Sequence, residues 1–254
     1  YDTAIARWFQ GKEGAALRYG ENPHQAAGFY ADLSGEGLGG AEVLEGGKEL
    51  SYNNWLDLDG AVTAANDLPA PAAIVVKHTN PCGAALASSA EEALRKAWDG
   101  DPLSAFGSVI AVNAVFDAAC AEYLVGPGHF VEVVAAAEFE AAAVEILRTK
   151  PKWGKNVRLV RVPGLGTAKR EQSEERRVWG GILVQGSDNL HAFDAELKLA
   201  GSTPVPAGRE DDLRLAQVIV KHLKSNAVCL VRDGMLIGAG AGQMSRVDSA
   251  KIAV

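Results

Sequence analysis

A chain of 254 residues, 48% apolar and 22% charged, has the composition of an ordinary globular protein and can form one large domain or two small ones. The formal net charge of −7 argues against a nucleic-acid-binding protein, which normally shows a basic field. The sequence shows neither a signal peptide nor a long uncharged apolar run, so we expect no membrane segment. Its three cysteines are far apart and odd in number, which fits a reducing, cytoplasmic compartment better than a disulfide framework.

Short apolar runs alternate with amphipathic stretches along the chain, which predicts alternating strands and helices. The expected strands are at 26–30, 74–76, 108–112, 130–134, 157–162, 180–185, 228–231 and 235–237. The expected helices are at 2–9 (or the tail of a preceding domain), 53–67, 89–98, 117–125, 139–149, 210–223 and from 245 onward. This alternation indicates an α/β protein with a mostly parallel sheet that is covered on both faces.

Several helices carry recognisable local signals. Asn53 or Asn54 is the expected N-cap of the helix that ends near residue 67, and Ser88 or Ser89 is the expected N-cap of the next one. Asp233 and the glycine after it predict a hairpin turn. The helix at 210–223 is expected to bury a stripe of apolar residues at helical spacing: Leu213, Ala216, Val220 and Leu223.

The charged and irregular stretch at 163–178 is interpreted as a solvated linker. We therefore divide the chain into a first α/β subdomain at 1–165, a connecting segment at 166–208 and the start of a second α/β subdomain at 209–254. The second unit looks unfinished, and the first residue is Tyr1 rather than an initiator Met. We expect the chain to be a piece of a longer polypeptide.

The most informative stretch runs from residue 74 to residue 83. Its apolar run predicts a strand buried on both faces, and Asn80-Pro81 is expected to end that strand because proline lacks an N–H donor. Lys77 and His78 would then lie at the carboxyl end of a central strand, where open α/β sheets bind their ligands. The alternative is a snorkelling lysine beside a core histidine that bonds to the backbone.

Two further motifs are weaker. The glycine-rich segment at 238–246 follows a strand and opens a helix, so its N–H groups can approach an anion, but it matches neither a Rossmann fingerprint nor a P-loop. Residues 80–83 resemble part of a zinc-deaminase signature, but the second cysteine and the H-x-E triplet are absent, so we exclude zinc. Cys82 is interpreted as a small turn residue rather than a nucleophile. Three histidines with unremarkable neighbours are interpreted as structural or exposed: His129, His191 and His222.

Six motifs in one order together resemble the AICAR transformylase domain of the bifunctional purine-biosynthesis enzymes, AICAR transformylase/IMP cyclohydrolase. They are LRYGENPHQ at 17–25, LSYNN at 50–54, KHTNPCGAA at 77–85, SAFG at 104–107, KSNAV at 224–228 and IGAGAGQMSR at 237–246. The resemblance spans nearly the whole chain and identifies residues 1–9 as the exit from a cyclohydrolase domain. It implies a duplicated, cytidine-deaminase-like three-layer α/β fold with an incomplete second unit. Family members continue past the position of residue 254 with a segment that completes this unit and supplies folate contacts.

The resemblance also implies an activity and a set of site residues. The implied reaction is formyl transfer from 10-formyltetrahydrofolate to the 5-amino group of AICAR, which gives FAICAR. The reaction is expected to use no zinc, and the implied assembly is a homodimer with active sites at the subunit interface. Lys77 and His78 match the catalytic pair, and Asn226 matches a catalytic asparagine. The positions that match nucleotide contacts are Arg18, Tyr19, Asn54, Phe106, Gly107, Glu132 and Arg246.

These residue types suit that chemistry. The AICAR amine is conjugated to a ring that bears a carboxamide, so it is a poor nucleophile and needs a base, and a neutral His78 imidazole can supply about 10²–10⁴-fold in rate. The Lys77 ammonium and the Asn226 amide can stabilise the oxyanion that develops on the formyl oxygen. Arg18 and Arg246 suit a phosphate. The competing hypothesis is a catalytically incomplete module that binds a purine ribonucleotide or dimerises, whereas the motifs do not favour an IMP cyclohydrolase.

Overall fold

The computed structural model describes residues 15–31, 35–168 and 173–254, so the helix expected at 2–9 lies outside the described residues. In chain order the elements are β1 (Ala15–Leu17), β2 (Ala27–Phe29), the 3₁₀ helix η1 (Gly37–Gly40), β3 (Glu42–Val43), α2 (Tyr52–Asn66), β4 (Ala72–Lys77), β5 (Asn80–Leu86), α3 (Ala90–Asp99), α4 (Pro102–Ala105), β6 (Ser108–Phe116), α5 (Ala118–Leu124), β7 (Val131–Phe139), α6 (Ala141–Thr149), β8 (Arg158–Arg161), β9 (Ser173–Val178), β10 (Gly181–Gly186), α7 (Glu210–His222), β11 (Val228–Arg232), β12 (Met235–Gly240) and α8 (Arg246–Ala253).

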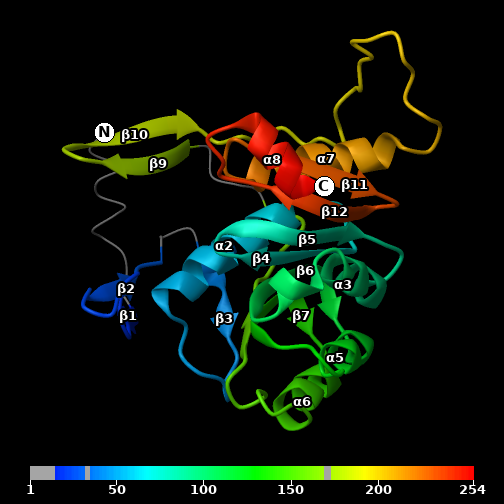
Figure 1. Ribbon diagram of the computed structural model, residues 1–254. Helices are drawn as coiled ribbons and strands as arrows, with labels where there is room; N and C mark the ends of the chain where they lie inside the picture. Colours follow the sequence, from blue (N-terminus) through cyan, green and yellow to red (C-terminus); the bar gives the residue numbers. More distant parts are fainter. Residues whose placement is uncertain (1–14, 32–34, 169–172) are drawn as a thin grey trace.

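One large sheet organises the molecule (Figure 1). Its eight strands follow the order β11-β12-β5-β4-β6-β7-β8-β3. Among the described strands of this sheet, the pairs β6–β7 and β7–β8 are parallel, whereas the other five pairs are antiparallel. The fold is therefore α/β with a mixed sheet, and the mostly parallel sheet expected from the sequence is wrong.

The difference begins at a tight hairpin that the sequence did not reveal. Asn80-Pro81 does not end a strand but begins β5, and β4 turns into β5 through His78 and Thr79, with Lys77 paired to Asn80. The φ angles of His78 and Thr79 are 51° and 62°. Positive φ at both central residues is the requirement of a type I′ turn, which is usually made by Asn-Gly. A His-Thr pair gives no such signal, so the hairpin was missed.

Helices cover both faces of the sheet (Figure 1), and alternate side chains of β4 enter two separate cores. Ile74 and Val76 pack on the side of α2 and α7, whereas Ala73 and Val75 pack on the side of α3, α5 and α6. This confirms that β4 is buried on both faces, as its continuous apolar run predicted. No helix within the described ranges has the length and apolar character needed to cross a bilayer.

Helix α2 is fixed at both ends, which matters because it borders the tip of β4. Its N-cap is Ser51 rather than either predicted asparagine, since the Ser51 hydroxyl accepts from the Asn54 N–H and the Asn54 side chain accepts from the Ser51 N–H, both at 3.1 Å. This reciprocal pair is a capping box. At the other end, the buried Asn113 amide donates to carbonyls at the end of α2 and accepts from the Ala72 N–H at 2.7 Å. The helix and β4 are thereby held in one register.

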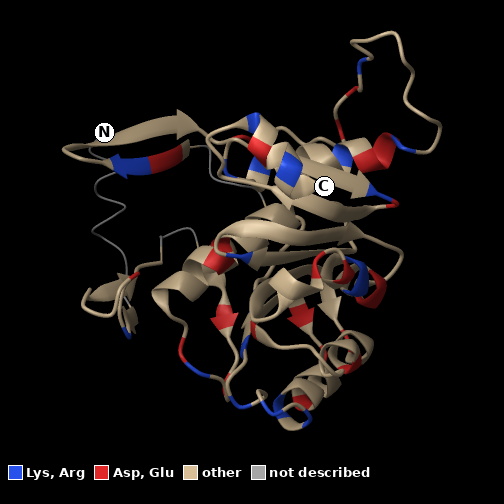
Figure 2. Cartoon of the chain, in the orientation of Figure 1, with Lys and Arg blue, Asp and Glu red and all other residues tan. Residues whose placement is uncertain are grey.

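Helix α7 is amphipathic as predicted, but only part of the stripe chosen for burial is right. Of the four predicted residues, Leu223 is buried and Ala216 is half-buried, whereas Leu213 and Val220 are 43% and 39% exposed. The helix instead buries Leu215, Val218 and Ile219. Both stripes have helical spacing, so periodicity alone could not separate them. The first turn of α7 carries three acidic residues, red in Figure 2, which favours the positive end of the helix dipole.

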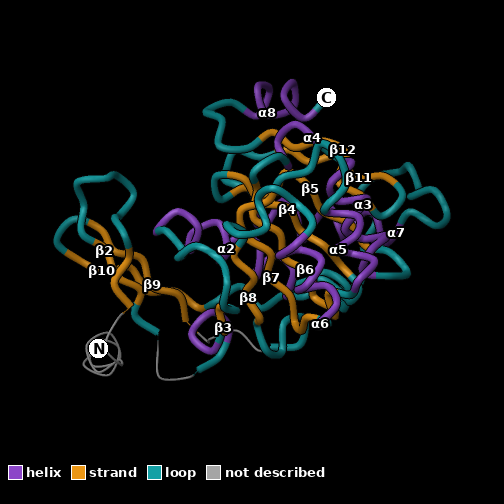
Figure 3. The backbone as a smooth tube through the Cα atoms, turned by 90° about the horizontal axis from the view of Figure 1, so that it is seen from below, coloured by secondary structure: helices purple, strands orange, loops and turns teal. Residues whose placement is uncertain are grey.

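Two hairpins lie beside this layered body. β1 pairs with β2 and β9 pairs with β10 as separate two-stranded sheets, and Figures 1 and 3 show both on the same side of the large sheet. β9 occupies Ser173–Val178, so these residues are not irregular, contrary to the expectation, although they are solvated as expected. Their charged side chains are mostly exposed, and an isolated hairpin has no buried face to impose the apolar alternation that signals a strand.

The glycine-rich segment after Ile237 serves helix packing. A Cβ at Gly238 or Gly240 would lie 2.0 Å from the carbonyl oxygen of Ala253 or Ser249, respectively, so only glycine lets α8 approach β12 this closely. The two glycines are two positions apart on the strand and therefore lie on the same face of it. Close helix packing thus accounts for these glycines without an anion.

Candidate functional site

Lys77 and His78 lie together at the tip of β4. The half-buried Lys77 ammonium donates to the carbonyl oxygens of Phe106 at 3.1 Å and Gly107 at 2.8 Å. Gly107 has a φ of 72°, and a Cβ there would lie 3.2 Å from Lys77 Nζ, so glycine allows this close approach. His78 is exposed in the turn, which makes the core-histidine alternative wrong. The strand tip therefore presents an accessible imidazole beside a fixed cation.

Asp57 belongs to the same cluster, although the sequence did not single it out. Its Oδ1 atom accepts the Thr79 N–H at 2.6 Å. Burial raises the pKa of the Asp57 carboxyl, while this hydrogen bond and the charges of His78 and Lys77 oppose the rise, so the carboxylate lies within electrostatic reach of both. Asp57 follows Asn54 by three residues and hence shares its face of α2, which is the one signal that could have found it.

A second group of polar residues joins α2 to β7 and β8. The buried Asn54 donates from Nδ2 to Glu132 Oε2 at 2.9 Å, and the same oxygen lies 3.8 Å from Arg158 Nη1. Burial lowers the pKa of Arg158; the charge of Glu132 opposes this shift and the charge of Arg18 adds to it, so Arg18 lies within electrostatic reach of Arg158. Arg18 in turn lies over the Tyr19 ring, 4.8 Å from its centre. The sequence had not indicated Arg158.

Asn226 and Arg246 lie at the opposite end of the chain, around the loop that leads from β12 to α8. Asn226 Nδ2 donates to the carbonyl oxygens of Gln243 at 3.0 Å and Met244 at 3.1 Å. Both hydrogens of its amide are therefore used within this loop. Arg246 is exposed and begins α8.

One hydrogen bond ties this loop region to the strand tip. The Lys224 N–H, two residues before Asn226, donates to Asn80 Oδ1 at 3.2 Å. Within the described residues, the side-chain hydrogen bonds of Asn226 do not include Lys77 or His78. The structure thus joins Lys77 directly to the 106–107 turn and Asn54 directly to Glu132, whereas Asn226 and Arg246 belong to a neighbouring loop.

Comparison with known proteins identifies the family. The family model described as the AICARFT/IMPCHase bienzyme matches residues 1–254. The chain belongs to this family. It is 46% identical over 270 residues to the bifunctional purine biosynthesis protein PurH of Rhodopirellula baltica, and 43% identical over 257 and 273 residues to the PurH proteins of Desulfitobacterium hafniense and Agrobacterium fabrum.

These alignments cover 100%, 96% and 100% of this chain but 51%, 46% and 49% of the three relatives. The chain therefore spans about half the length of the PurH proteins that it matches. The resemblance to the bienzyme family that the six motifs indicated is confirmed.

Cys82 has no features of a nucleophile in this AICARFT/IMPCHase chain. It lies on β5 rather than in a turn, so that part of the interpretation is wrong, and its thiol lies 3.5 Å from the Val75 carbonyl oxygen. Burial raises the pKa of the Cys82 thiol to about 12, which keeps it protonated at neutral pH. Across the described ranges, no group of three or more His, Cys, Asp or Glu residues is arranged to hold a metal ion.

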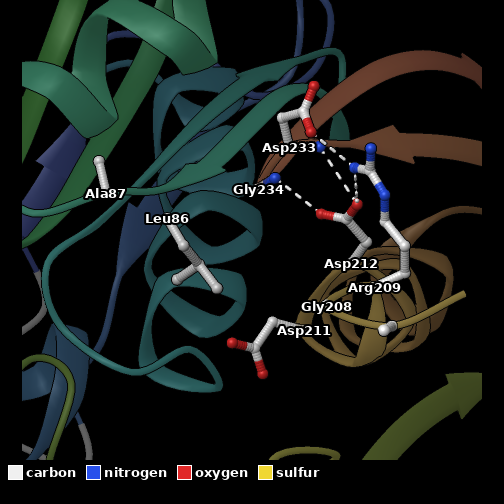
Figure 4. Close-up of a pocket in the computed structure, with 9 residues that line it drawn as sticks. Leu86, Ala87, Gly208, Arg209, Asp211, Asp212, Asp233 and Gly234 are labelled. Carbon is white, nitrogen blue, oxygen red and sulfur yellow. Dashed lines mark hydrogen bonds and ion pairs between the residues drawn. The ribbon is translucent and has the colours of Figure 1, made fainter.

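A cavity of about 560 Å³ lies at the far end of β5 from the turn (Figure 4). Arg209 borders it and pairs with Asp212 at 2.9 Å and Asp233 at 2.6 Å, while Asp212 also accepts the Gly234 N–H at 2.7 Å. Two carboxylates therefore neutralise this arginine. The cavity does not suit an anionic nucleotide, and we place the candidate site of this family member at the tip of β4.

Proposed function

We propose that this half of the family enzyme transfers the formyl group of 10-formyltetrahydrofolate to the 5-amino group of AICAR, giving FAICAR in the synthesis of IMP. The observation that carries the proposal is the strand tip, where an exposed imidazole follows an ammonium held by two backbone carbonyls. The family match and the name of the PurH relatives, purine biosynthesis proteins, support the same substrate class.

His78 is the proposed base. As the amine nitrogen attacks the formyl carbon, the imidazole takes the amine proton, and the carbon–nitrogen bond to the folate breaks as the leaving nitrogen regains a proton. A positioned general base typically raises the reaction rate by about 10²–10⁴-fold. The exposure of His78 supports this role, because the imidazole must reach the amine of a bound substrate.

Lys77 is the proposed electrostatic partner. An ammonium has three N–H donors, and the carbonyls of Phe106 and Gly107 take two of them. The third is available for the formyl oxygen as negative charge develops on it. Asn226 is less suited to that task, since both of its N–H donors already serve the 243–244 loop. We assign Asn226 to shaping the site, with its amide oxygen left for substrate.

The nucleotide is proposed to bind beside the strand tip. Arg18 and Arg246 are assigned to the phosphate, and Asn54 and Glu132 to polar groups of the nucleotide. Two cations, Arg18 and Arg158, lie near the single Glu132 carboxylate, so this group keeps a net positive charge that can attract an anion. Tyr19, Phe106 and Gly107 complete the proposed contacts.

The proposal includes the wider setting that the family resemblance implies. We propose a cytoplasmic homodimer with folate and AICAR at interfacial sites, without zinc, nucleic acid or membrane as partners. The duplicated cytidine-deaminase-like fold and the division at residues 165 and 208 are part of the same proposal. The described sheet is consistent with a connection between the units, since β12 pairs with β5.

An assay of the 254-residue chain tests the proposal. Formyl transfer is followed with AICAR and 10-formyltetrahydrofolate, beside calorimetry with AICAR alone and a parallel assay of the full-length protein. Turnover by the chain supports the formyltransferase. AICAR binding without turnover by either protein would favour a ribonucleotide-binding module, and absence of AICAR binding in both would contradict the proposed site.

A further inference from the structure

The turn that presents His78 has an unfavourable backbone conformation. His78 and Thr79 both adopt positive φ, at 51° and 62°, although neither is glycine. L-residues rarely occupy this region, and for a β-branched residue such as Thr79 it is a true outlier. Conformations of this kind persist where surrounding contacts hold them, and they cluster at functional sites.

Two side chains hold the backbone polar groups of this turn. Asp57 Oδ1 accepts the Thr79 N–H at 2.6 Å, and Asn80 Nδ2 donates to the His78 carbonyl oxygen at 2.9 Å. Asn80 is itself part of the hairpin, whereas Asp57 belongs to a separate element. Asp57 therefore ties the turn directly to helix α2, whereas Asn80 ties the hairpin to the Lys224 N–H.

Helix α2 is a rigid support for this contact. The capping box of Ser51 and Asn54 fixes the start of the helix, and Asp57 follows one turn later. Gly60, a further turn along, places its backbone against the turn, since a Cβ there would lie 3.7 Å from the Thr79 carbonyl oxygen. The same face of α2 thus faces the His78 turn at two successive positions.

We propose that Asp57 is a positioning residue for His78: its carboxylate holds the Thr79 N–H and so maintains the left-handed turn that presents the imidazole to substrate. The catalytic consequence rests on the proposed formyl transfer, but the structural contact does not. A charged acceptor suits this task, because hydrogen bonds to carboxylates are shorter and stronger than those to neutral groups. An asparagine at position 57 keeps an acceptor of the same shape without the charge.

The test compares Asp57→Ala, Asp57→Asn and the control Glu145→Gln in the full-length protein; Glu145 is an exposed carboxylate on α6. Asp57→Ala is expected to lower kcat by about 10²-fold, the size of effect that a displacement of about 1 Å can produce, with KM for AICAR within about twofold of wild type. Asp57→Asn should recover about tenfold of the lost kcat, and Glu145→Gln should match wild type. Hydrogen exchange of the Thr79 amide, followed by NMR, should accelerate about tenfold in Asp57→Ala.

Each outcome has a defined meaning. A wild-type kcat in Asp57→Ala, measured on protein that transfers formyl, overturns the positioning role. If wild type does not transfer formyl, the proposed function fails, and Thr79 exchange alone decides about Asp57: faster exchange in Asp57→Ala supports the contact and unchanged exchange overturns it. If Asp57→Ala does not fold, a reduced kcat and faster Thr79 exchange in Asp57→Asn support the role, whereas wild-type values of both overturn it.

Discussion

Replacing Thr79 by glycine separates backbone strain from function at the strand tip. An L-residue in the left-handed region costs about 1–2 kcal/mol, and Thr79 has a φ of 62°. Glycine removes that cost but loses about 0.5–1 kcal/mol more backbone freedom on folding. The difference predicts that Thr79→Gly makes the protein more stable in urea unfolding, by about 0–1.5 kcal/mol.

The same variant should lose activity. A glycine lets the turn sample more conformations, so the imidazole of His78 spends less time in its productive position, and we expect kcat to fall about tenfold. Thr79→Asn is the matched variant, since asparagine tolerates positive φ with less added freedom; it should stabilise the protein while it keeps more of the activity. Glycine adopts this φ without steric cost, so a loss of more than about 0.5 kcal/mol of stability in Thr79→Gly would refute the strain argument.

Three further predictions concern other described residues. Asp67, which is 8% exposed, lies 2.8 Å from His222 Nε2 and 3.0 Å from Lys221 Nζ. Asp67→Ala should lower the free energy of unfolding by about 3 kcal/mol, because it removes the carboxylate that partners the His222 ring and, among the described residues, leaves Lys221 with only Asp188; a loss below about 1 kcal/mol in urea unfolding would contradict this. Burial raises the pKa of all three cysteine thiols, that of Cys82 to about 12. The native protein should therefore react slowly with iodoacetamide at pH 8, whereas all three thiols should react in urea. Rapid labelling of the native protein would show that burial does not protect the thiols. Arg18→Ala should raise the Kd for AICAR by about 10–100-fold in calorimetry, because the variant loses about 1.5–3 kcal/mol of charged hydrogen bonding. An unchanged Kd would show that Arg18 does not bind the phosphate.

Elements with local signals were predicted from the sequence. Ser89 caps α3 by accepting the Glu92 N–H, and Asp233-Gly234 forms the hairpin between β11 and β12. β4 is buried on both faces as its apolar run indicated. These features depend on a few neighbouring residues, so the pattern of residue types is enough to find them.

The strand pairing was missed because it depends on a turn with unusual residues. His78 and Thr79 adopt the left-handed conformation without glycine or asparagine, and a distant carboxylate at Asp57 holds them there. β9 was missed for a related reason, since an exposed hairpin needs no apolar alternation. In both cases tertiary context replaces the local signal.

The candidate site divides in the same way. Lys77 and His78 stood out because a polar pair ended an apolar run, and the structure places them at a strand tip. Asp57 and Arg158 were missed because their importance comes from partners far away in the sequence: Thr79 for Asp57, and Glu132 for Arg158. Acidic and basic residues are common on surfaces, and only the fold shows which of them face the site.

Turnover of His78→Ala in the full-length protein tests the central claim most directly. Steady-state formyl transfer is measured beside calorimetry with AICAR, and His191→Ala, an exposed histidine in another loop, is the control. We predict that kcat falls by about 10²–10⁴-fold in His78→Ala while the Kd for AICAR changes little and His191→Ala behaves like wild type. Wild-type turnover in His78→Ala would contradict the assignment of this imidazole as the base.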